Sequence, residues 1–296
     1  MSNFLHILFL KDNEVIALFA IIVFFFAGLA FYEAFKYDRK ISKGEKPHED
    51  KSGSDRLLSW PFLARKEFLA AIFVTIGLLV WGIVTDAPLE EVANASSTPN
   101  PSKAPWYFLG LQEMLVYFDP WIAGVTFPSL IIVGLMAIPY IDVNPKGSGY
   151  YTFKERWFAI SVFSFGFLFM WIALIAVGVF VRGPGWMWFW PWQEWNPHRI
   201  IAETNYDLSQ FIGIDSKSLL GFVVGGGVIV VYYIVGIAVP YLYMKHKKMQ
   251  VIEKLGIERY AMVAFLFLTM MGLPIKVFLR LVFHLKYVWV TPWFNI

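Results

Sequence analysis

The feature that most constrains this 296-residue chain is a series of long apolar runs without charged residues. A helix needs about 20 apolar residues to cross about 30 Å of hydrocarbon, whereas the strands of a membrane barrel are roughly ten residues long and alternate in polarity. Six runs are long enough for helices and too uniformly apolar for such strands, at 15–32, 68–85, 120–141, 157–181, 218–244 and 260–275. The chain is therefore predicted to be all-α and polytopic, with about six transmembrane helices.

Composition points the same way. Charged residues make up 16% of the chain and hydrophobic residues 58%, while soluble domains carry roughly 25% charged residues. The absence of cysteine excludes disulfides and thiolate ligands to zinc or iron–sulfur clusters on this chain. The net charge of +3 is too small to indicate nucleic-acid binding.

The distribution of lysine and arginine predicts the orientation in the membrane. Segments 36–66, 142–156 and 245–259 hold 17 of the 25 basic residues, and such segments stay on the cytoplasmic side. Both termini and the loops 86–119 and 182–217 are then expected on the outer, periplasmic side. The same pattern predicts a multi-pass protein of the bacterial inner membrane.

Several kinds of site are not expected within this chain. No histidine lies inside an apolar run and no two are three or four residues apart, so neither a bis-histidine haem nor a metal site is predicted. The first five runs contain no charge, which argues against an ion-coupled transporter. Gly225, Gly226 and Gly227 lack the lysine of a P-loop and are expected to allow close helix approach or bending. The histidines are His6, His48, His198, His246 and His284.

The last apolar run carries a basic stripe. Lys276, Arg280 and His284 follow Pro274 at spacings that place them on one helix face. One interpretation is an interfacial helix whose long side chains reach the headgroups. The alternative is a contact for a lipid phosphate, a cofactor propionate or a carboxylate of a partner.

The loop at 86–119 carries the most chemistry. Four prolines between Pro88 and Pro105 prevent a long helix, and a short helix is expected to begin directly after them. That helix would hold an aromatic series together with a glutamine and a carboxylate, which suits a flat, amphipathic ring that releases protons, such as a quinol. The residues concerned are Pro105, Trp106, Tyr107, Phe108, Gln112 and Glu113.

The other outer loop is rich in tryptophan. Its indoles are predicted to form an aromatic belt at the level of the headgroups. They are Trp186, Trp188, Trp190, Trp192 and Trp195.

These motifs resemble the C-terminal half of cytochrome b, including subunit IV of the photosynthetic cytochrome bf complex. The series in the first outer loop matches at Asn94, Thr98, Pro99, Trp106, Tyr107 and Phe108. The stretch GLMAIPYID at 134–142, followed by Asn144 and Pro145, is similar to the end of the family's next helix. The resemblance covers 66–244 as four spans, with an additional helix and linker at 1–65 and an additional helix and tail at 245–296.

The resemblance implies a haem-free subunit of a quinol:cytochrome c oxidoreductase. Such a subunit forms part of the outer quinol-oxidation site, couples quinol oxidation to proton release and translocation, and binds menaquinol or ubiquinol. It implies that haem b lies on a di-haem cytochrome b N-terminal-type subunit and the iron–sulfur cluster on a Rieske-type protein. Cytochrome c, membrane lipids and a second copy of the complex are the further partners implied.

Two departures from the family pattern bear on mechanism. Ala104 and Pro105 stand where the family has proline and glutamate, and Asn94 is followed by Ala95. We expect Glu113 and Tyr107 to be the catalytic residues, with Glu113 as the replacement for the missing proton acceptor; the alternative is that Glu113 pairs with a subunit or caps a helix. Pro105, Trp106, Tyr107 and Phe108 are expected to line the quinol pocket. The alternative function is a structural membrane anchor of a respiratory complex without an active quinone pocket.

Overall fold

The computed structural model describes residues 5, 7–9, 11–45, 58–86, 92, 94–96, 98–143, 152–198 and 204–296. The chain forms two compact units, one of residues 100–145 and 158–296 and a smaller one of 2–99 and 146–157. Each unit is described separately below. The division into 1–65, 66–244 and 245–296 follows the family resemblance and stays a prediction.

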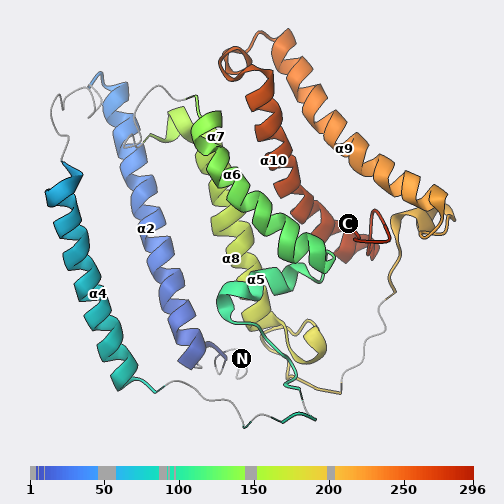
Figure 1. Cartoon of the computed structure of the whole chain (residues 1–296), viewed down its shortest axis with the longest axis horizontal. Helices are drawn as coiled ribbons and strands as arrows, with labels where there is room; N and C mark the ends of the chain where they lie inside the picture. The colour runs from blue at the N-terminus through green and yellow to red at the C-terminus, as the bar shows by residue number, and fades with distance from the viewer. Residues whose placement is uncertain are drawn as a thin grey trace. The chain divides into compact units, whose positions relative to one another are not determined.

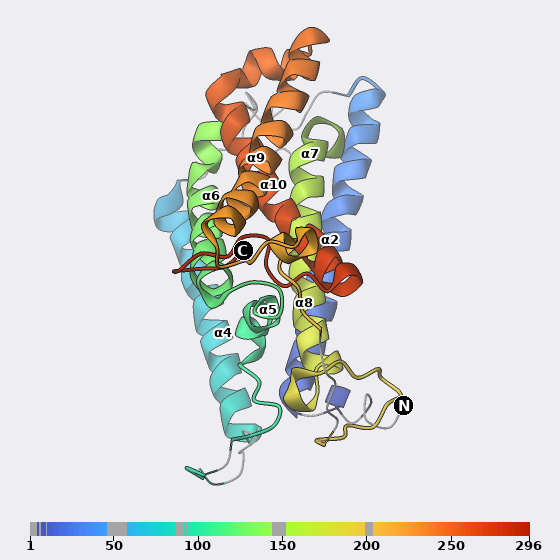
Figure 2. The same cartoon turned by 90° about the vertical axis from the view of Figure 1, so that its right-hand side faces the viewer.

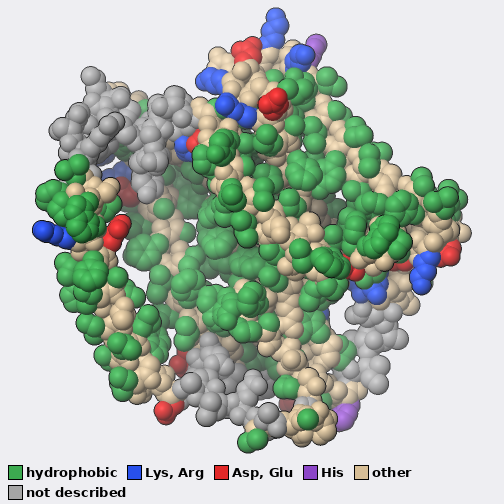
Figure 3. All heavy atoms as spheres, in the orientation of Figure 1, with side chains coloured by type: hydrophobic (Ala, Val, Ile, Leu, Met, Phe, Trp, Pro, Cys, Tyr) green, Lys and Arg blue, Asp and Glu red, His purple; other side chains and the backbone are tan. Residues whose placement is uncertain are grey.

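The predicted number of spans is confirmed. Across the described ranges, six helices are long and apolar enough to cross a membrane. The β-type pairing in these ranges is limited to isolated bridges, and no strand is formed there. Large apolar side chains such as Phe73, Ile83 and Leu219 are 73%, 82% and 81% exposed, and apolar atoms cover the visible face of the helices (Figure 3). So much exposed apolar surface fits lipid. The helices are Asn13–Ser42, Ser59–Val84, Ile122–Ile141, Phe153–Val181, Leu219–His246 and Gln250–Phe283.

The smaller unit contains α2 (Lys11–Ser42), η1 (Ser59–Leu63), α4 (Ala64–Val84) and the start of α7 (Phe153–Phe163). Asp38 of α2 is buried, and its carboxylate accepts hydrogen bonds from the backbone N–H groups of Phe153 and Lys154, both at 3.1 Å. The first N–H groups of a helix have no partner within it. Asp38 therefore caps α7 from a helix more than a hundred residues earlier.

The larger unit holds the remaining helices. The short helix predicted after Pro105 is present as α5, and it lies beside α8 in both views (Figures 1 and 2). The elements are α5 (Trp106–Met114), η2 (Ile122–Thr126), α6 (Phe127–Ile141), η3 (Ser164–Trp171), α8 (Ile172–Ala176), η4 (Val177–Val181), η5 (Pro184–Trp186), η6 (Leu208–Ile212), α9 (Leu219–His246) and α10 (Gln250–Phe283).

Two glycines let α5 approach the α8–η4 helix closely. A Cβ atom at Gly178 would lie 2.8 Å from the Leu109 side chain, and one at Gly110 would lie 3.4 Å from Ile175 and Trp171. Leu109 is 2% exposed. The crossing therefore depends on the absence of a side chain at Gly178.

The buried core of this unit surrounds the end of α5. Its side chains come from α5 and the turn after it, from η2, from the η3–α8 helix and from α10, so that one cluster joins four segments. Apolar packing thus fixes the position of the last turn of α5. The cluster consists of Met114, Tyr117, Phe118, Ala123, Met170, Leu174 and Leu273.

Helices α9 and α10 form an antiparallel pair (Figure 1), and the turn that joins them is rich in lysine. The hydroxyl of Tyr232 donates to the carbonyl of Leu268 at 2.8 Å, which ties the two helices together. Gly225 of α9 faces the C-terminal tail, because a Cβ atom there would lie 2.6 Å from the Val288 carbonyl. The close approach expected at this glycine is thus made by the tail and not by a helix.

The two loops expected on the outer side meet at one end of the larger unit. The Gly185 N–H of one loop donates to the Asn100 side chain of the other at 2.6 Å, and Asn295 of the tail donates to Asp119 at 3.3 Å. These contacts agree with the predicted topology of the larger unit. The side of the membrane on which this end lies stays a prediction.

Candidate functional site

The segment before α5 is held by a glutamine. Gln112 accepts a hydrogen bond from the backbone N–H of Ala104 at 2.7 Å and donates to the carbonyl of Ser102 at 2.9 Å. The prolines of this segment leave few backbone donors, so a side chain supplies the contacts that a helix or sheet would otherwise make. Residues 98–105 are not helical, as the prolines predicted.

Glu113 lies at the centre of the site and is completely buried. Arg182 binds the Glu113 carboxylate through two hydrogen bonds, from Nη2 to Oε1 at 2.7 Å and from Nε to Oε2 at 2.9 Å. This bidentate geometry is the strongest form of the Arg–carboxylate contact. Glu113 therefore forms an ion pair within this chain.

Two further donors complete the shell of Glu113. The indole N–H of Trp186 donates to Oε2 at 3.1 Å, and the hydroxyl of Tyr117 donates to Oε1 at 3.1 Å. Arg182 also donates from Nη1 to the backbone carbonyl of Trp186 at 3.0 Å. Glu113, Arg182 and Trp186 thus form a closed ring of contacts, which we call the Glu113 cluster together with Tyr117.

The electrostatics of the Glu113 cluster keep its donors protonated. Burial raises the pKa of Tyr117 to about 12, and the negative charge of Glu113 adds to the effect. Burial alone would lower the pKa of Arg182, but the hydrogen bonds and charge of Glu113 outweigh it and raise that pKa. Both side chains therefore act as hydrogen-bond donors throughout the physiological pH range.

Trp186 adopts an unusual backbone conformation. Its φ is 57°, in the left-handed region, directly after Gly185 with a φ of 66°. A bulky residue is rarely found in that region, and such strain persists only where surrounding contacts impose it. Here the contacts are the two hydrogen bonds that Glu113 and Arg182 make with Trp186, together with the bond from the Trp186 backbone N–H to the Gly183 carbonyl at 3.0 Å.

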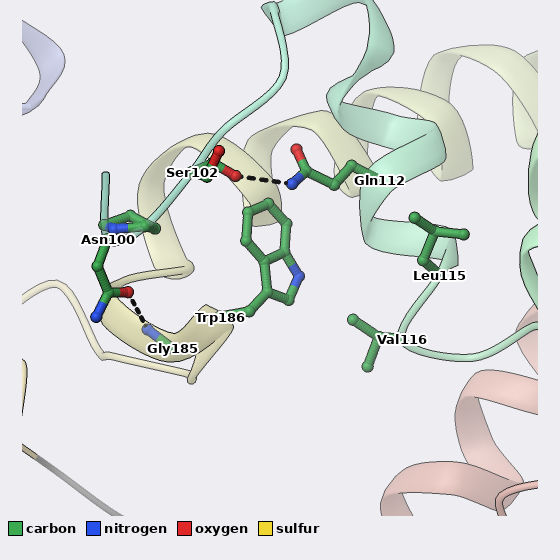
Figure 4. A pocket seen from close by; sticks show the side chains of 8 residues that line it. Asn100, Ser102, Gln112, Leu115, Val116, Gly185 and Trp186 are labelled. Atoms are coloured by element: carbon green, nitrogen blue, oxygen red, sulfur yellow. Dashed lines mark hydrogen bonds between the residues drawn. The ribbon is translucent and has the colours of Figure 1, made fainter. Parts of the chain in front are cut away.

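An open pocket of about 400 Å³ lies beside this cluster. The Trp186 indole stands between the segment of Asn100 and Ser102 on one side and α5 on the other (Figure 4). Asn100 is fixed by accepting a hydrogen bond from the Gly185 N–H at 2.6 Å. The pocket is lined by Asn100, Pro101, Ser102, Gln112, Leu115, Val116, Gly185 and Trp186.

The aromatic series predicted to line a quinol pocket lies elsewhere on α5. Tyr107 and Phe108 are each 53% exposed, with ring centroids 4.9 Å apart, and Trp106 meets Tyr107 edge to face at 5.7 Å. Pro105 precedes the first turn of α5 as its N-cap. None of these residues belongs to the lining of the 400 Å³ pocket. Their binding of quinol, and the catalytic role of Tyr107, stay predictions.

The basic stripe near the C-terminus is folded against the tail. Lys276 is 3% exposed and donates to the Lys286 carbonyl at 2.6 Å. Arg280 bonds the side chain of Asn205, and His284 ends α10 in a left-handed conformation with φ 54°. Lys276 thus stabilises the tail. A contact of the stripe with lipid, a cofactor or a partner stays a prediction.

A half-buried cation lies near the site. The Lys103 ammonium stands 5.1 Å from the centroid of the Trp195 ring, and burial lowers its pKa to about 8. Its hydrogen bond to Val179 ties residues 98–105, which we call the proline segment, to η4. Lys103 therefore helps to fix the position of the segment that forms one side of the pocket.

Metal ligands do not converge in the part of the chain that the structure describes. No group of three or more histidine, aspartate or glutamate side chains there could hold a metal ion. His6 and His48 lie outside the described residues.

The Glu113 cluster was only partly visible in the sequence. Trp186 was assigned to an aromatic belt, and neither Arg182 nor Tyr117 was singled out. One signal was present: a carboxylate on a short apolar helix requires a cation when buried, and Arg182 directly follows the apolar run at 157–181.

Comparison with known proteins confirms the family resemblance over part of the chain. Residues 92–189 match the family model described as Cytochrome b(C-terminal)/b6/petD. This segment contains α5, the spans at Ile122–Ile141 and Phe153–Val181, and all residues of the Glu113 cluster. Asn144 and Pro145 fall within the match but outside the described residues.

Two curated relatives carry the description menaquinol:cytochrome c reductase cytochrome c subunit. The protein from Geobacillus thermodenitrificans is 28% identical over 118 residues, which cover 37% of this chain and 47% of the relative. The protein from Bacillus subtilis (strain 168) is 33% identical over 106 residues, which cover 34% and 39%. The chain thus spans less than half the length of these relatives. No solved structure matches it significantly.

Proposed function

We propose that this chain is a haem-free membrane subunit of a quinol:cytochrome c oxidoreductase and forms part of its outer quinol-oxidation site. The observation that carries the proposal is the place of the family match. Residues 92–189 include the proline segment, α5 and the loop of Trp186, and these segments surround one pocket. A pocket with an indole wall and a few amide groups suits a flat amphipathic ring.

The aromatic series on α5 supplies a second surface for the same site. Tyr107 and Phe108 leave half of their area uncovered in this chain, and large aromatic residues are typical of the centre of an interface. We assign this surface to the contact with a di-haem cytochrome b N-terminal-type subunit, which would close the quinol site from the other side. Tyr107 would then face quinol at the boundary between the two subunits.

The partners follow from the same proposal. Haem b would lie on the di-haem subunit, and a Rieske-type iron–sulfur protein would take the first electron from quinol. The descriptions of the two relatives favour menaquinol as the quinol and cytochrome c as the acceptor. We place the assembly, as a dimeric complex that translocates protons, in a bacterial inner membrane.

Purification through a tag on this chain in mild detergent tests the proposal. We expect haem b by optical spectroscopy, a Rieske signal by EPR and extractable quinone in the same preparation. The preparation should also reduce cytochrome c with a menaquinol analogue. A chain that arrives without haem b and without quinone would contradict the proposal.

A scaffold without an active pocket is the second candidate. The observations that favour it are the loss of the family's glutamate at Ala104–Pro105 and the engagement of Glu113 by Arg182. Chemical modification separates the two functions. Quinone analogues should protect Trp186, which lines the pocket, from modification in the complex if the pocket is real, and leave its modification rate unchanged if the chain is a scaffold.

A further inference from the structure

The Trp186 indole connects the pocket with the buried ion pair. One face of the side chain borders the pocket beside Asn100 and Gln112 (Figure 4). Its three polar groups are all used inside the protein: Glu113 accepts from the indole N–H, Arg182 donates to the backbone carbonyl, and the backbone N–H donates to the Gly183 carbonyl at 3.0 Å. The wall of the pocket is therefore attached directly to the ion pair.

The ion pair also maintains the strained backbone of Trp186. A φ of 57° places Trp186 in the left-handed region, which is sparsely populated and unfavourable for a non-glycine residue. Without the hydrogen bonds to Glu113 and Arg182, only the bond from its backbone N–H to the Gly183 carbonyl would oppose relaxation of this residue toward the usual negative φ. The indole would then leave its place between the proline segment and α5.

Both carboxylate oxygens of Glu113 are fully engaged. They receive four hydrogen bonds, from Arg182, Trp186 and Tyr117, and a carboxylate can accept about four in all. Glu113 is thus enclosed by side chains of its own chain and holds no position open toward the pocket. This geometry suits a fixed anion that holds its neighbours in place.

We propose that Glu113 and Arg182 are positioning residues that fix the Trp186 indole as the stacking wall for the quinol ring, and thereby set quinol affinity. The inference rests on the proposed function and places the ring in the 400 Å³ pocket. The side-chain amide nitrogen of Asn100 makes no hydrogen bond to another described residue, so it can donate to an oxygen of the ring. Glu113 is then not the proton acceptor that the sequence led us to expect.

Steady-state kinetics of the purified complex tests the inference. Three variants perturb the cluster. Trp186→Phe removes the indole N–H, and Glu113→Gln keeps the side-chain shape but removes the charge. Arg182→Lys keeps the charge but loses the planar guanidinium that binds the carboxylate through two hydrogen bonds. Trp192→Phe is the matched control, because Trp192 is exposed and stacks only on Trp190 among its described ring contacts. Haem b content checks assembly of each variant.

We expect the three cluster variants to raise the KM for the menaquinol analogue about tenfold, which corresponds to about 1.4 kcal/mol. Their kcat and its pH profile should stay within about twofold of the parent, and Trp192→Phe should change neither constant. Equilibrium binding of a quinone analogue should weaken in parallel with KM. This second measurement also applies to any variant that assembles but turns over slowly.

Three other outcomes are distinct. A lower kcat with a shifted pH profile and an unchanged KM in Glu113→Gln would overturn the inference and make Glu113 the proton acceptor. An unchanged KM and unchanged analogue affinity in Trp186→Phe would overturn the inference while the active parent complex keeps the proposed function. A parent complex without quinol oxidation would overturn both.

Discussion

Replacing Arg182 with methionine should destabilise the protein severely. The substitution keeps most of the side-chain volume but removes the cation from a carboxylate that is completely buried. Glu113 would keep only the hydrogen bonds from Trp186 and Tyr117. Removal of one partner from a buried ion pair costs about 3–5 kcal/mol, because the remaining charge stays buried without compensation. We expect a loss of that size in the free energy of unfolding.

A double-mutant cycle separates this effect from general disruption of the core. Glu113→Leu should cost a similar amount, whereas the double variant Glu113→Leu/Arg182→Met should lie within about 1–2 kcal/mol of the parent, since two apolar side chains can replace a buried pair. Unfolding in detergent, followed by circular dichroism, measures all four proteins. The exposed pair of Lys36 and Glu33, whose side chains are 46% and 50% exposed, is the control, and its removal should cost less than about 1 kcal/mol. Additive losses in the double variant would refute the reasoning.

Three further predictions concern other contacts. Gly178→Leu should push α5 away through the Leu109 side chain and lower the free energy of unfolding, measured by thermal unfolding, by about 1–3 kcal/mol. Adding Leu109→Ala should recover part of this loss. A loss no larger than that of a surface substitution would contradict the close crossing of the two helices. Asp38→Ala should cost about 1–2 kcal/mol through the lost cap of α7, while Asp38→Asn should cost less because it keeps an acceptor; equal losses would argue against a capping role. The folded-state pKa of Lys103 is about 8, below the usual value of about 10.5. Because the unfolded chain binds more protons between these two values, the free energy of unfolding should rise with pH across that window. Lys103→Met should remove this rise, and an unchanged pH slope in the variant would exclude Lys103 as its source.

The helices could be predicted because their constraint is local. A run at 218–244 corresponds to a helix at Leu219–His246, since length and apolar composition alone satisfy the requirement of the bilayer. The short helix at Trp106–Met114 was predictable for the same local reason, because the prolines before it stop at Pro105. The ends were less predictable. α10 starts ten residues before the expected run at 260–275, and its backbone is non-helical at Gly256, with φ 70°, so a short helical stretch precedes the span across a kink.

The site depends on contacts that no local pattern contains. Glu113 and Arg182 are 69 residues apart, and nothing in either neighbourhood specifies the other. The flank of α5 that borders the pocket was also unpredictable, because packing at Gly178 decides how the helix is rotated. Trp186 looked like one of five equivalent indoles until the left-handed turn set it apart. Sequence reasoning therefore located the segment that lines the 400 Å³ pocket, and the quinol contacts that it assigned to Pro105, Trp106, Tyr107 and Phe108 stay predictions.

The separation of Glu113 from Arg182 also has a consequence for biogenesis. During synthesis α5 leaves the ribosome well before Arg182, which is 69 residues further along the chain. Until then the carboxylate has no counter-charge and must stay in water. The docking of α5 is therefore postponed until the span at Phe153–Val181 has been inserted. The ion pair thus delays formation of the pocket until Arg182 and Trp186, the last residue that lines it, have been synthesised.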